Sequence, residues 1–192
     1  MIRFAVAIFS VMLACLIAAR VSLANSIDKG NPAGGASKLD RAMFAAGCFW
    51  KTQYVFSKVP GVVKTQVGFT GGTAPNPSYE QVCTNKTGHA ETVLVEYDPS
   101  KTTYRKLLEA FWMNHDPTTT NRQGPDFGTQ YRSVVFYTTP EQKKEATEYK
   151  AELEKSHKFN APIVTAIEPA GQFYQAEEYH QNYYAKHGAV CF

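Results

Sequence analysis

The amino-acid sequence predicts an α+β protein, a two-layer sandwich with a ferredoxin-like βαββαβ core and C-terminal extensions. The first observation behind this prediction is the order of strand-like and helix-like hydrophobic patterns, which follows the split βαβ arrangement. The second is that proline and glycine separate many of these segments. The third is the composition, since 44% hydrophobic and 19% charged residues in a chain of 192 are typical of one globular domain with a short addition.

The first half of the core is predicted as two strands around one helix. Arg41 to Ala46 is a short apolar run that ends at Gly47, which indicates a buried strand. Residues 48–59 follow as a helix, because apolar side chains recur on one of its faces, and Pro60-Gly61 ends it. Residues 62–69 then form the second strand.

The second half of the core begins after a loop. Residues 70–78 are rich in glycine and proline, and residues 79–84 form one helical turn. Residues 91–97 alternate as a strand does, and Asp98-Pro99 ends that strand. Apolar residues at i, i+3, i+4 and i+7 then predict an amphipathic helix through Tyr104, Leu107, Leu108 and Phe111.

The C-terminal part adds further elements. Residues 115–128 are a long polar loop, and residues 131–138 form a strand with apolar residues on both faces, which favours a central place in the sheet. A helix over 139–158 starts with Thr139 as its N-cap, and Gln142 completes a capping box. A further strand and a segment of helical composition follow, at residues 163–167 and 175–186.

The first 24 residues have the pattern of a secretory signal peptide. Arg3 gives a positive start, Phe4 to Ala19 is an uncharged apolar run, and Ser22-Leu23-Ala24 places small residues where a signal peptidase reads. One alternative is an uncleaved membrane anchor, for which 16 apolar residues are short of the ~20 that a span needs. Another is a lipoprotein at Cys15, but the apolar run continues past that cysteine.

The sequence therefore predicts an exported protein, periplasmic or secreted, without stable membrane insertion after cleavage. Residues 1–24 are the signal peptide, residues 25–38 a flexible linker, and residues 39–192 the folded domain. The formal net charge is +3, and without residues 1–24, which hold two arginines and no acid, it is +1 (18 bases against 17 acids). A near-neutral domain is not built around nucleic acid, and we expect a monomer.

Cys48 is the first candidate for chemistry. It follows Gly47 at the predicted junction from strand to helix, where backbone N–H groups and the positive end of the helix dipole favour a thiolate. Gly47 has no side chain to crowd the sulfur. Phe49 and Trp50 add two aromatic faces, which suit an apolar thioether-like group. The alternative is a structural cysteine buried in an aromatic core.

Glu91 is the second candidate. In the predicted strand it shares a face with Val93, Val95 and Tyr97, so its carboxyl points to an apolar side. Burial raises the pKa of a carboxyl, and a neutral carboxyl is a usable general acid. If the strand starts one residue later, Glu91 is solvated instead.

Two tyrosines and an aspartate are further candidates. Tyr79 lies before Glu91, and Tyr131 opens the strand over 131–138. A buried tyrosine hydroxyl can hold a polar oxygen, although with 11 tyrosines in the chain the default for each is a core or surface residue. Asp126 precedes Tyr131, and its ordinary interpretation is a turn residue.

The mature chain keeps three cysteines, Cys48, Cys83 and Cys191. An odd number in an exported protein indicates a reactive thiol as readily as a structural bridge. Cys191 is the penultimate residue, and a mobile chain end suits a resolving thiol that approaches Cys48 and leaves again. The alternative is a static disulfide of Cys191 with Cys83 or Cys48. Cys83 itself is interpreted as packed and inert.

We predict no metal and no cofactor. His89-Ala90-Glu91 matches half of a zinc deaminase signature, but the required Pro-Cys-x-x-Cys is missing, because only Cys191 follows. His180 and His187 are interpreted as a solvated helix face. The sequence has no P-loop, Rossmann glycine pattern or hydrolase elbow.

Taken together, these residues resemble one family over about residues 41–191. Gly47-Cys48-Phe49-Trp50 is similar to the active-site motif of the A-type peptide methionine sulfoxide reductases. The other matching motifs follow in order, and they are Gly68–Gly72, Tyr79–Cys83, Gly88–Glu91, Tyr97–Pro99, Phe111–Trp112, His115–Pro117, Asp126–Ser133 and Ala176–Gln181.

The resemblance implies a reaction and a set of roles. Cys48 attacks the sulfur of methionine S-sulfoxide, either the free amino acid or a residue in an oxidised protein. Glu91, Tyr79 and Tyr131 hold and protonate the departing oxygen, and Asp126 supports the site. The product is methionine, and the cysteine becomes a sulfenic acid.

The resemblance also implies how the substrate is held and how the enzyme is recycled. Phe49 and Trp50 cradle the methyl group. Cys191 forms a disulfide with Cys48, and a thioredoxin-like protein reduces it. Many relatives have two cysteines in a longer glycine-rich tail, whereas this sequence has one before Phe192, so a two-stage relay is not implied. The alternatives are a relative that only binds oxidised methionine, and a thiol peroxidase or general thiol oxidoreductase.

Overall fold

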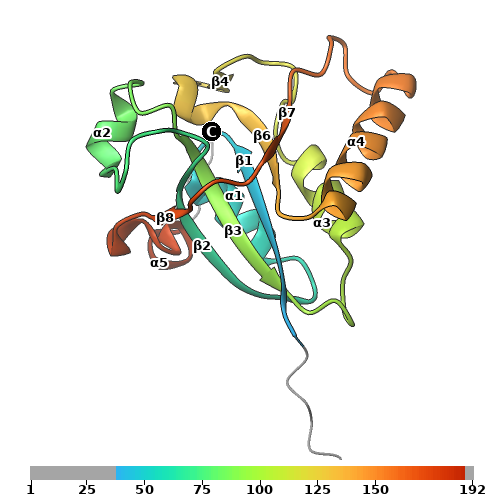
Figure 1. The fold of residues 1–192 in the computed structure, drawn as a ribbon, viewed down its shortest axis with the longest axis horizontal. Helices are drawn as coiled ribbons and strands as arrows, with labels where there is room; N and C mark the ends of the chain where they lie inside the picture. Colours follow the sequence, from blue (N-terminus) through green and yellow to red (C-terminus); the bar gives the residue numbers. More distant parts are fainter. Residues whose placement is uncertain (1–37, 189–192) are drawn as a thin grey trace, which may run out of the picture. The chain divides into compact units, whose positions relative to one another are not determined.

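The computed structural model describes residues 38–188 (Figure 1). The predictions for the signal peptide, nearly all of the linker and Cys191 lie outside these residues. The elements are β1 (Asp40–Ala46), α1 (Phe49–Ser57), β2 (Val62–Thr70), α2 (Tyr79–Cys83), β3 (Ala90–Tyr97), α3 (Tyr104–Met113), β4 (Arg122–Gln123), β5 (Asp126–Phe127), β6 (Ser133–Tyr137), α4 (Pro140–Lys155), β7 (Ala166–Pro169), β8 (Tyr174–Gln175) and α5 (Tyr183–His187). Two 3-10 turns, Thr129–Tyr131 and Glu178–His180, complete the set.

The predicted α+β core is confirmed by the strand order of the main sheet, β7-β6-β1-β3-β2-β8. Its four middle strands pair antiparallel throughout, and with α1 and α3 they form the split βαβ arrangement. The extensions are also present, since β7 pairs parallel with β6 after α4 and β8 pairs antiparallel with β2. β6 therefore has a neighbour on both sides, but it lies next to the edge strand β7.

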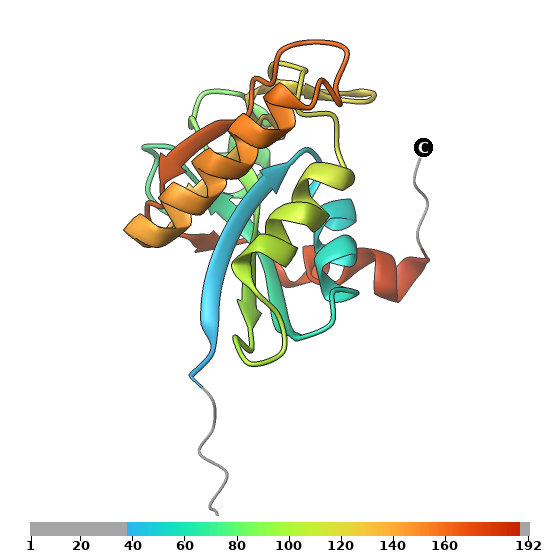
Figure 2. The ribbon, with the colours of Figure 1, turned by 90° about the vertical axis from the view of Figure 1, so that its right-hand side faces the viewer.

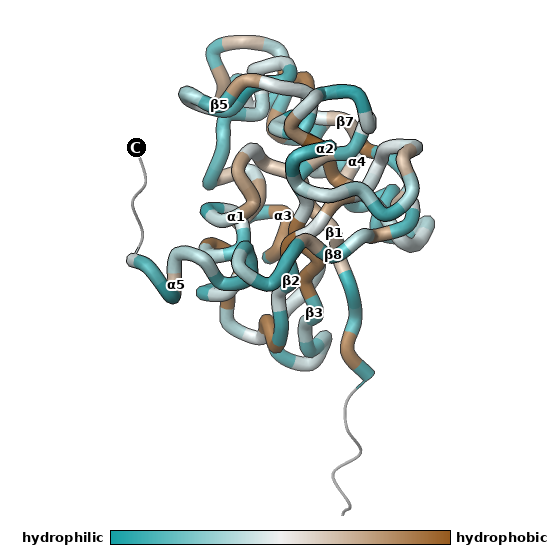
Figure 3. Tube along the Cα trace, turned by 90° about the vertical axis from the view of Figure 1, so that its left-hand side faces the viewer, coloured by the Kyte–Doolittle hydropathy of each residue, from teal (hydrophilic) through white to brown (hydrophobic). Residues whose placement is uncertain are grey.

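The sheet separates a large helical core from a small second cluster. Ala42 and Phe44 of β1 face the main core, together with buried residues of the helices such as Phe56 and Leu107. The alternate residue Ala45 faces the other side, where it packs near Phe136. Figure 2 shows α1 and α3 on the same side of β1, and Figure 3 shows apolar residues along these elements but a largely hydrophilic α5.

Three predicted boundaries in the C-terminal part are wrong. Tyr131 does not open a strand, because it ends the 3-10 turn that begins after Gly128, and pairing with β1 starts at Ser133. The strand predicted over 163–167 is β7, which begins three residues later. Thr139 caps α4 as predicted, but Gln142 accepts from the N–H of Thr138, so the capping box is not closed at the N-cap.

The segment predicted as one helix over 175–186 is instead three short elements held by side-chain amides. Gln181 is buried, accepts from the N–H of Val67 at 2.9 Å and donates to the Val67 carbonyl oxygen at 2.9 Å, as a neighbouring strand would. Gln53 accepts from the N–H of Asn182 at 2.7 Å. Asn182 is in the left-handed region at φ +55°, which interrupts a helix. These bonds attach the segment to β2 and α1.

Within residues 38–188, no helix is long and apolar enough to cross a membrane.

Candidate active site

Cys48 occupies the N-cap position of α1, directly after β1. The preceding Gly47 has φ +82°, and a Cβ there would lie 2.5 Å from the Cβ of Gln123. Both features exclude a side chain. Gln123 is held by two bonds to the backbone of Asp116, at 2.9 and 3.0 Å. The sequence suggested that Gly47 keeps the approach to sulfur open, and the structure shows that it makes room for the hairpin of β4 and β5.

Glu91 lies at the start of β3 with 2% of its surface exposed, and its carboxyl faces the helical side as the alternation predicts. The alternative of a solvated Glu91 is wrong. Its Oε2 accepts from the N–H of Phe49 at 2.9 Å. This bond satisfies one of the free donors at the start of α1, where the Cys48 side chain makes no capping bond. Burial raises the pKa of Glu91 to about 8, against the lowering effect of that N–H.

The thiol of Cys48 does not have the lowered pKa that its place at a helix start predicts. The backbone N–H groups of Trp50 and Lys51 do lower it. Burial and the carboxylate of Glu91 act more strongly in the opposite direction and raise the pKa of Cys48 to about 12. The resting cysteine is therefore a thiol, and protonation of Glu91 removes one of the causes that keep it so.

The structure brings Tyr79, Tyr131 and Asp126 to these two residues from three further elements. Burial and the charge of Glu91 raise the pKa values of both tyrosines, so both hydroxyls stay protonated and can donate. Burial also raises the pKa of Asp126, which acts in turn on Glu91 and Cys48. Both hydroxyl donors are therefore close to the carboxyl of Glu91, and Tyr131 is also close to the thiol of Cys48.

The 3-10 turn that carries Tyr131 is fixed to the end of α2. Asn85, at φ +62°, accepts from the N–H of Thr129 at 2.7 Å. Tyr79 lies in α2, so this bond connects the supports of both tyrosines. Cys83 also lies in α2, and its thiol is among the groups that raise the pKa of the Tyr79 hydroxyl. From the sequence, Cys83 is interpreted as packed and inert. Its spacing of four residues from Tyr79 within one helical turn nevertheless places the two side chains on the same face.

Phe49 and Trp50 form part of an aromatic cluster beside Cys48. Phe49 is 1% exposed, and its ring centroid lies 6.5 Å from that of Trp50 and 6.4 Å from that of Tyr79. Trp50 stacks on Tyr183 of α5 at 3.9 Å. Aromatic faces next to the thiol provide an apolar wall that suits an S-methyl group.

The prediction that His180 lies on a solvated helix face is wrong. Its surface is 1% exposed, and its Nδ1 accepts from the indole N–H of Trp50 at 3.0 Å. His187 of the same pair is exposed. Periodicity missed His180 and Tyr183 because the segment that carries them is not one helix. One signal could have found His180, because it lies within the family motif Ala176–Gln181. Tyr183 lies outside that motif.

His89, which the sequence placed in half of a zinc deaminase signature, contacts a loop in the structure. No group of three or more His, Cys, Asp and Glu side chains there is placed to hold a metal ion. Both ring nitrogens of His89 contact the loop before it, at the N–H of Gly72 and the carbonyl oxygen of Ala74. His89 therefore organises a loop and is not available as a ligand.

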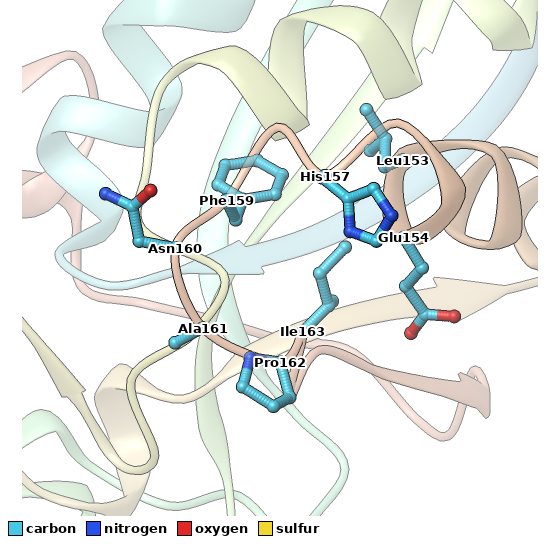
Figure 4. A pocket seen from close by; sticks show the side chains of 8 residues that line it. All are labelled: Leu153, Glu154, His157, Phe159, Asn160, Ala161, Pro162 and Ile163. Carbon is cyan, nitrogen blue, oxygen red and sulfur yellow. The ribbon is translucent and has the colours of Figure 1, made fainter.

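A separate hollow of about 380 Å³ lies at the C-terminal end of α4 (Figure 4). Its apolar floor includes Leu153 and Ile163, and its polar side chains Glu154, His157 and Asn160 are exposed. None of the predicted site residues lines it. The hollow has no buried polar group that would bind or activate a substrate.

Comparisons with known proteins identify the family of the chain. The family model for peptide methionine sulfoxide reductase matches residues 40–191. Peptide methionine sulfoxide reductase MsrA of Methanoculleus marisnigri is 63% identical over 150 residues, which cover 78% of this chain and 92% of that protein. The crystal structure of Mxr1 from Saccharomyces cerevisiae in reduced form is 38% identical, with a TM-score of 0.75, and the match covers 82% of this chain and 91% of that one.

A crystal structure of the same yeast protein in complex with Trx2 is 27% identical, with a TM-score of 0.55, over 82% of this chain and 88% of that one. The similarity thus extends over nearly the whole described domain, in sequence and in fold, and it includes every element that carries Cys48, Glu91 and the two tyrosines. The chain belongs to the peptide methionine sulfoxide reductase family.

Proposed function

We propose that Cys48 is the nucleophile with which this enzyme reduces methionine S-sulfoxide, free or in oxidised proteins. The observation that carries the proposal is the buried carboxyl of Glu91, whose pKa of about 8 keeps it protonated at neutral pH beside the N-cap of α1. A protonated acid next to a thiol supplies what a sulfoxide needs to lose its oxygen.

The chemistry balances without a cofactor. The sulfur of Cys48 bonds to the sulfoxide sulfur while Glu91 gives its proton to the sulfoxide oxygen, and the thiol proton returns to Glu91. The oxygen then moves from the substrate sulfur to the sulfur of Cys48, and the bond between the two sulfurs breaks, so a sulfoxide and a thiol become methionine and a sulfenic acid. Tyr79 and Tyr131, which remain protonated, donate hydrogen bonds to the oxygen on which charge develops. Asp126 supports the site from β5.

The substrate's methyl group is assigned to the aromatic wall. Phe49 and Trp50 lie directly after the nucleophile on the first turn of α1. Placing the methyl group against them aims the oxygen at Glu91 and the tyrosines, and only one sulfoxide epimer can satisfy both contacts. We propose that this one epimer is the S epimer, as the resemblance to the A-type family implies.

For the recycling step, Cys191 is proposed to form a disulfide with Cys48 and release water, and a thioredoxin-like dithiol then reduces that disulfide. Cys191 lies outside the described residues. Support comes from the structure in which the yeast relative Mxr1 is in complex with Trx2. The catalytic domain, residues 39–192, is proposed to act as a monomer.

Residues 1–24 and 25–38 are proposed to be a signal peptide and a linker, so that the enzyme works in the periplasm or outside the cell. The support is the order of Arg3, the apolar run Phe4–Ala19 and the small residues before Asn25. Mass spectrometry of the native protein should find a chain that starts at Asn25. A native chain that retains Met1 or Ile2 would contradict cleavage.

Turnover of the separated sulfoxide epimers with dithiothreitol tests the proposed function. The wild-type protein should reduce the S epimer, and Cys48→Ser should abolish the reaction, whereas Cys83→Ser serves as a matched thiol control that still turns over. Hydrogen peroxide is the competing substrate. Faster consumption of peroxide than of either sulfoxide would identify a thiol peroxidase instead.

A further inference from the structure

His180 lies against three side chains of the proposed site without being part of the reaction. Its ring centroid is 4.4 Å from Tyr79, 5.1 Å from Phe49 and 5.6 Å from Trp50. The residue is 1% exposed. The position is rigid, because the next residue, Gln181, is bonded to β2 through its side-chain amide.

The hydrogen bonds around His180 determine its tautomer. The indole nitrogen of Trp50 can only donate, so Nδ1 of His180 must be the acceptor of the 3.0 Å bond. Burial lowers the pKa of His180, which favours the neutral ring. The proton of the neutral ring is therefore on Nε2.

Nε2 points toward Glu177 and has no hydrogen-bond partner of its own. The buried Oε2 of Glu177 likewise has none, and the two atoms are 4.0 Å apart. The other oxygen of Glu177 accepts from the N–H of Tyr79 at 3.2 Å. A donor and an acceptor thus face each other between the residue proposed to hold the sulfoxide oxygen and the residue proposed to hold the methyl group.

We propose that His180, backed by Glu177, is a positioning residue that fixes the rotation of the Trp50 indole and thereby sets the size of S-alkyl group that the enzyme accepts. The inference rests on the proposed function for its substrate. The indole can turn about its Cα–Cβ and Cβ–Cγ bonds, and the stack on Tyr183 at 3.9 Å restrains the face of the ring. The hydrogen bond from Nε1 of Trp50 to His180 fixes the edge of the ring as well.

A matched pair of amide substitutions separates the bond from the bulk of the ring. In His180→Asn the amide oxygen lies near the position of Nδ1 and can still accept from Trp50. In His180→Gln the amide reaches the position of Nε2, so the acceptor for the indole is lost while a polar side chain of similar size remains. His157→Asn is the control, because His157 is exposed and its φ of +50° suits asparagine.

Kinetics and specificity give the first readout. We expect His180→Gln to raise KM for methionine S-sulfoxide about tenfold and to change kcat less than about threefold, because the methyl wall acts mainly in binding. The preference in kcat/KM for an S-methyl over an S-ethyl sulfoxide should fall about tenfold, since one methylene in a fitted pocket is worth at least that ratio. His180→Asn should keep KM and the preference for the S-methyl substrate close to the wild-type values.

The indole N–H resonances give a readout that needs no turnover. The chain has two tryptophans. Trp50 donates to His180, whereas the buried indole nitrogen of Trp112 has no partner, so Trp112 is an internal reference for folding. His180→Gln should move the Trp50 resonance and leave that of Trp112 in place, and His180→Asn and His157→Asn should move neither.

Three results would overturn the inference. One is an unchanged Trp50 resonance in folded His180→Gln, and another is an S-methyl preference within twofold of wild type in that variant. The third needs no variant at all, namely nitrogen NMR of the wild-type protein at neutral pH showing the proton of His180 on Nδ1. Loss of the proposed function would be seen separately, as an active Cys48→Ser enzyme with the Trp50 resonance unaffected.

Discussion

At the scale of single residues, Glu91 serves structure and chemistry with one carboxyl. Its Oε2 takes the N–H of Phe49 and so completes the start of α1. The same burial that makes this cap part of the core raises the pKa of the acid to about 8. A carboxylate that caps a helix at the protein surface is ionised, so the buried position of Glu91 in β3 is what makes this capping group a proton donor.

Replacing Glu91 by glutamine should remove the acid without removing the cap. The amide oxygen can still accept from Phe49, so α1 should form normally. The single-turnover rate of methionine formation should fall by about 10²–10⁴, the usual contribution of a general acid. Glu96→Gln is the control, since Glu96 lies on the same strand and pairs with exposed Arg41. Rapid-quench measurement of one turnover gives the answer, and a rate within about twofold of wild type would reject the role.

The same substitution should change how stability depends on pH. The folded pKa of Glu91 is raised from its ordinary 4.5 to about 8. Its contribution to stability is therefore complete below pH 4.5 and is lost as pH rises through 8. The 3.5-unit difference corresponds to at most about 5 kcal/mol. Glu91→Gln should be more stable than wild type at pH 8.5 and similar to it at pH 4.5, measured by urea unfolding.

A pH-independent difference between Glu91→Gln and wild type would show that Glu91 is already ionised in the folded protein. Glu96→Gln again serves as the control, because it removes a carboxyl from the same strand at a position paired with Arg41.

For single residues, the sequence predicted which side chains face the core better than it predicted their pKa values. Strand alternation was enough to turn Glu91 toward the core, because it depends only on period two. The thiol of Cys48 was assigned a lowered pKa from its helix position, but burial and Glu91 reverse that shift. Desolvation and a charge brought from another element depend on tertiary packing, which a local pattern does not contain.

At the scale of elements, periodicity found the segments whose contacts are apolar. The helix through Tyr104 and Phe111 was predicted because it buries one regular face. The strand of Glu91 is buried on nearly its whole length, and it was predicted because valines and a tyrosine alternate along it. The segment over residues 175–186 was predicted wrongly as one helix, because polar side chains and not an apolar face attach it to the sheet. Gln181 replaces a strand neighbour for Val67, and such a contact leaves no hydrophobic period to detect.

Gln181→Leu tests whether these amide bonds hold the segment. The substitution keeps the volume but leaves the N–H and carbonyl of Val67 without partners in a buried place, so the free energy of unfolding should fall by about 3 kcal/mol. Hydrogen exchange at the Val67 amide should accelerate. Gln175→Leu is the control on an exposed edge, with an expected change within about 0.5 kcal/mol. If Gln181→Leu and Gln175→Leu lowered the free energy of unfolding equally, the amide bonds of Gln181 would not be what holds the segment.

At the scale of the whole molecule, the strand order follows from the sequence of elements, because short right-handed connections allow few topologies for βαββαβ. The site does not follow in the same way. Cys48, Glu91, Tyr79, Asp126 and Tyr131 come from five different segments, and only the family motifs placed them together in advance. The residues that fix these elements, such as Gln123 in the hairpin and Asn85 beside the 3-10 turn, were missed because a side-chain bond to a backbone atom leaves no hydrophobic period in the sequence.

The proposed recycling involves both ends of the domain, because in the sequence Cys191 follows the last described helix, whereas Cys48 begins the first one. Cys191→Ser should leave the first chemical step intact, so about one equivalent of methionine should form per enzyme and Cys48 should be trapped as sulfenic acid. Turnover with thioredoxin should stop for lack of a disulfide to exchange. Dithiothreitol should restore turnover, since a small thiol reaches the sulfenic acid directly. Cys83→Ser is the matched control, and its hydroxyl can replace the thiol beside Tyr79. If Cys83→Ser stops thioredoxin-dependent turnover while Cys191→Ser does not, the resolving thiol is Cys83, which already lies within the site.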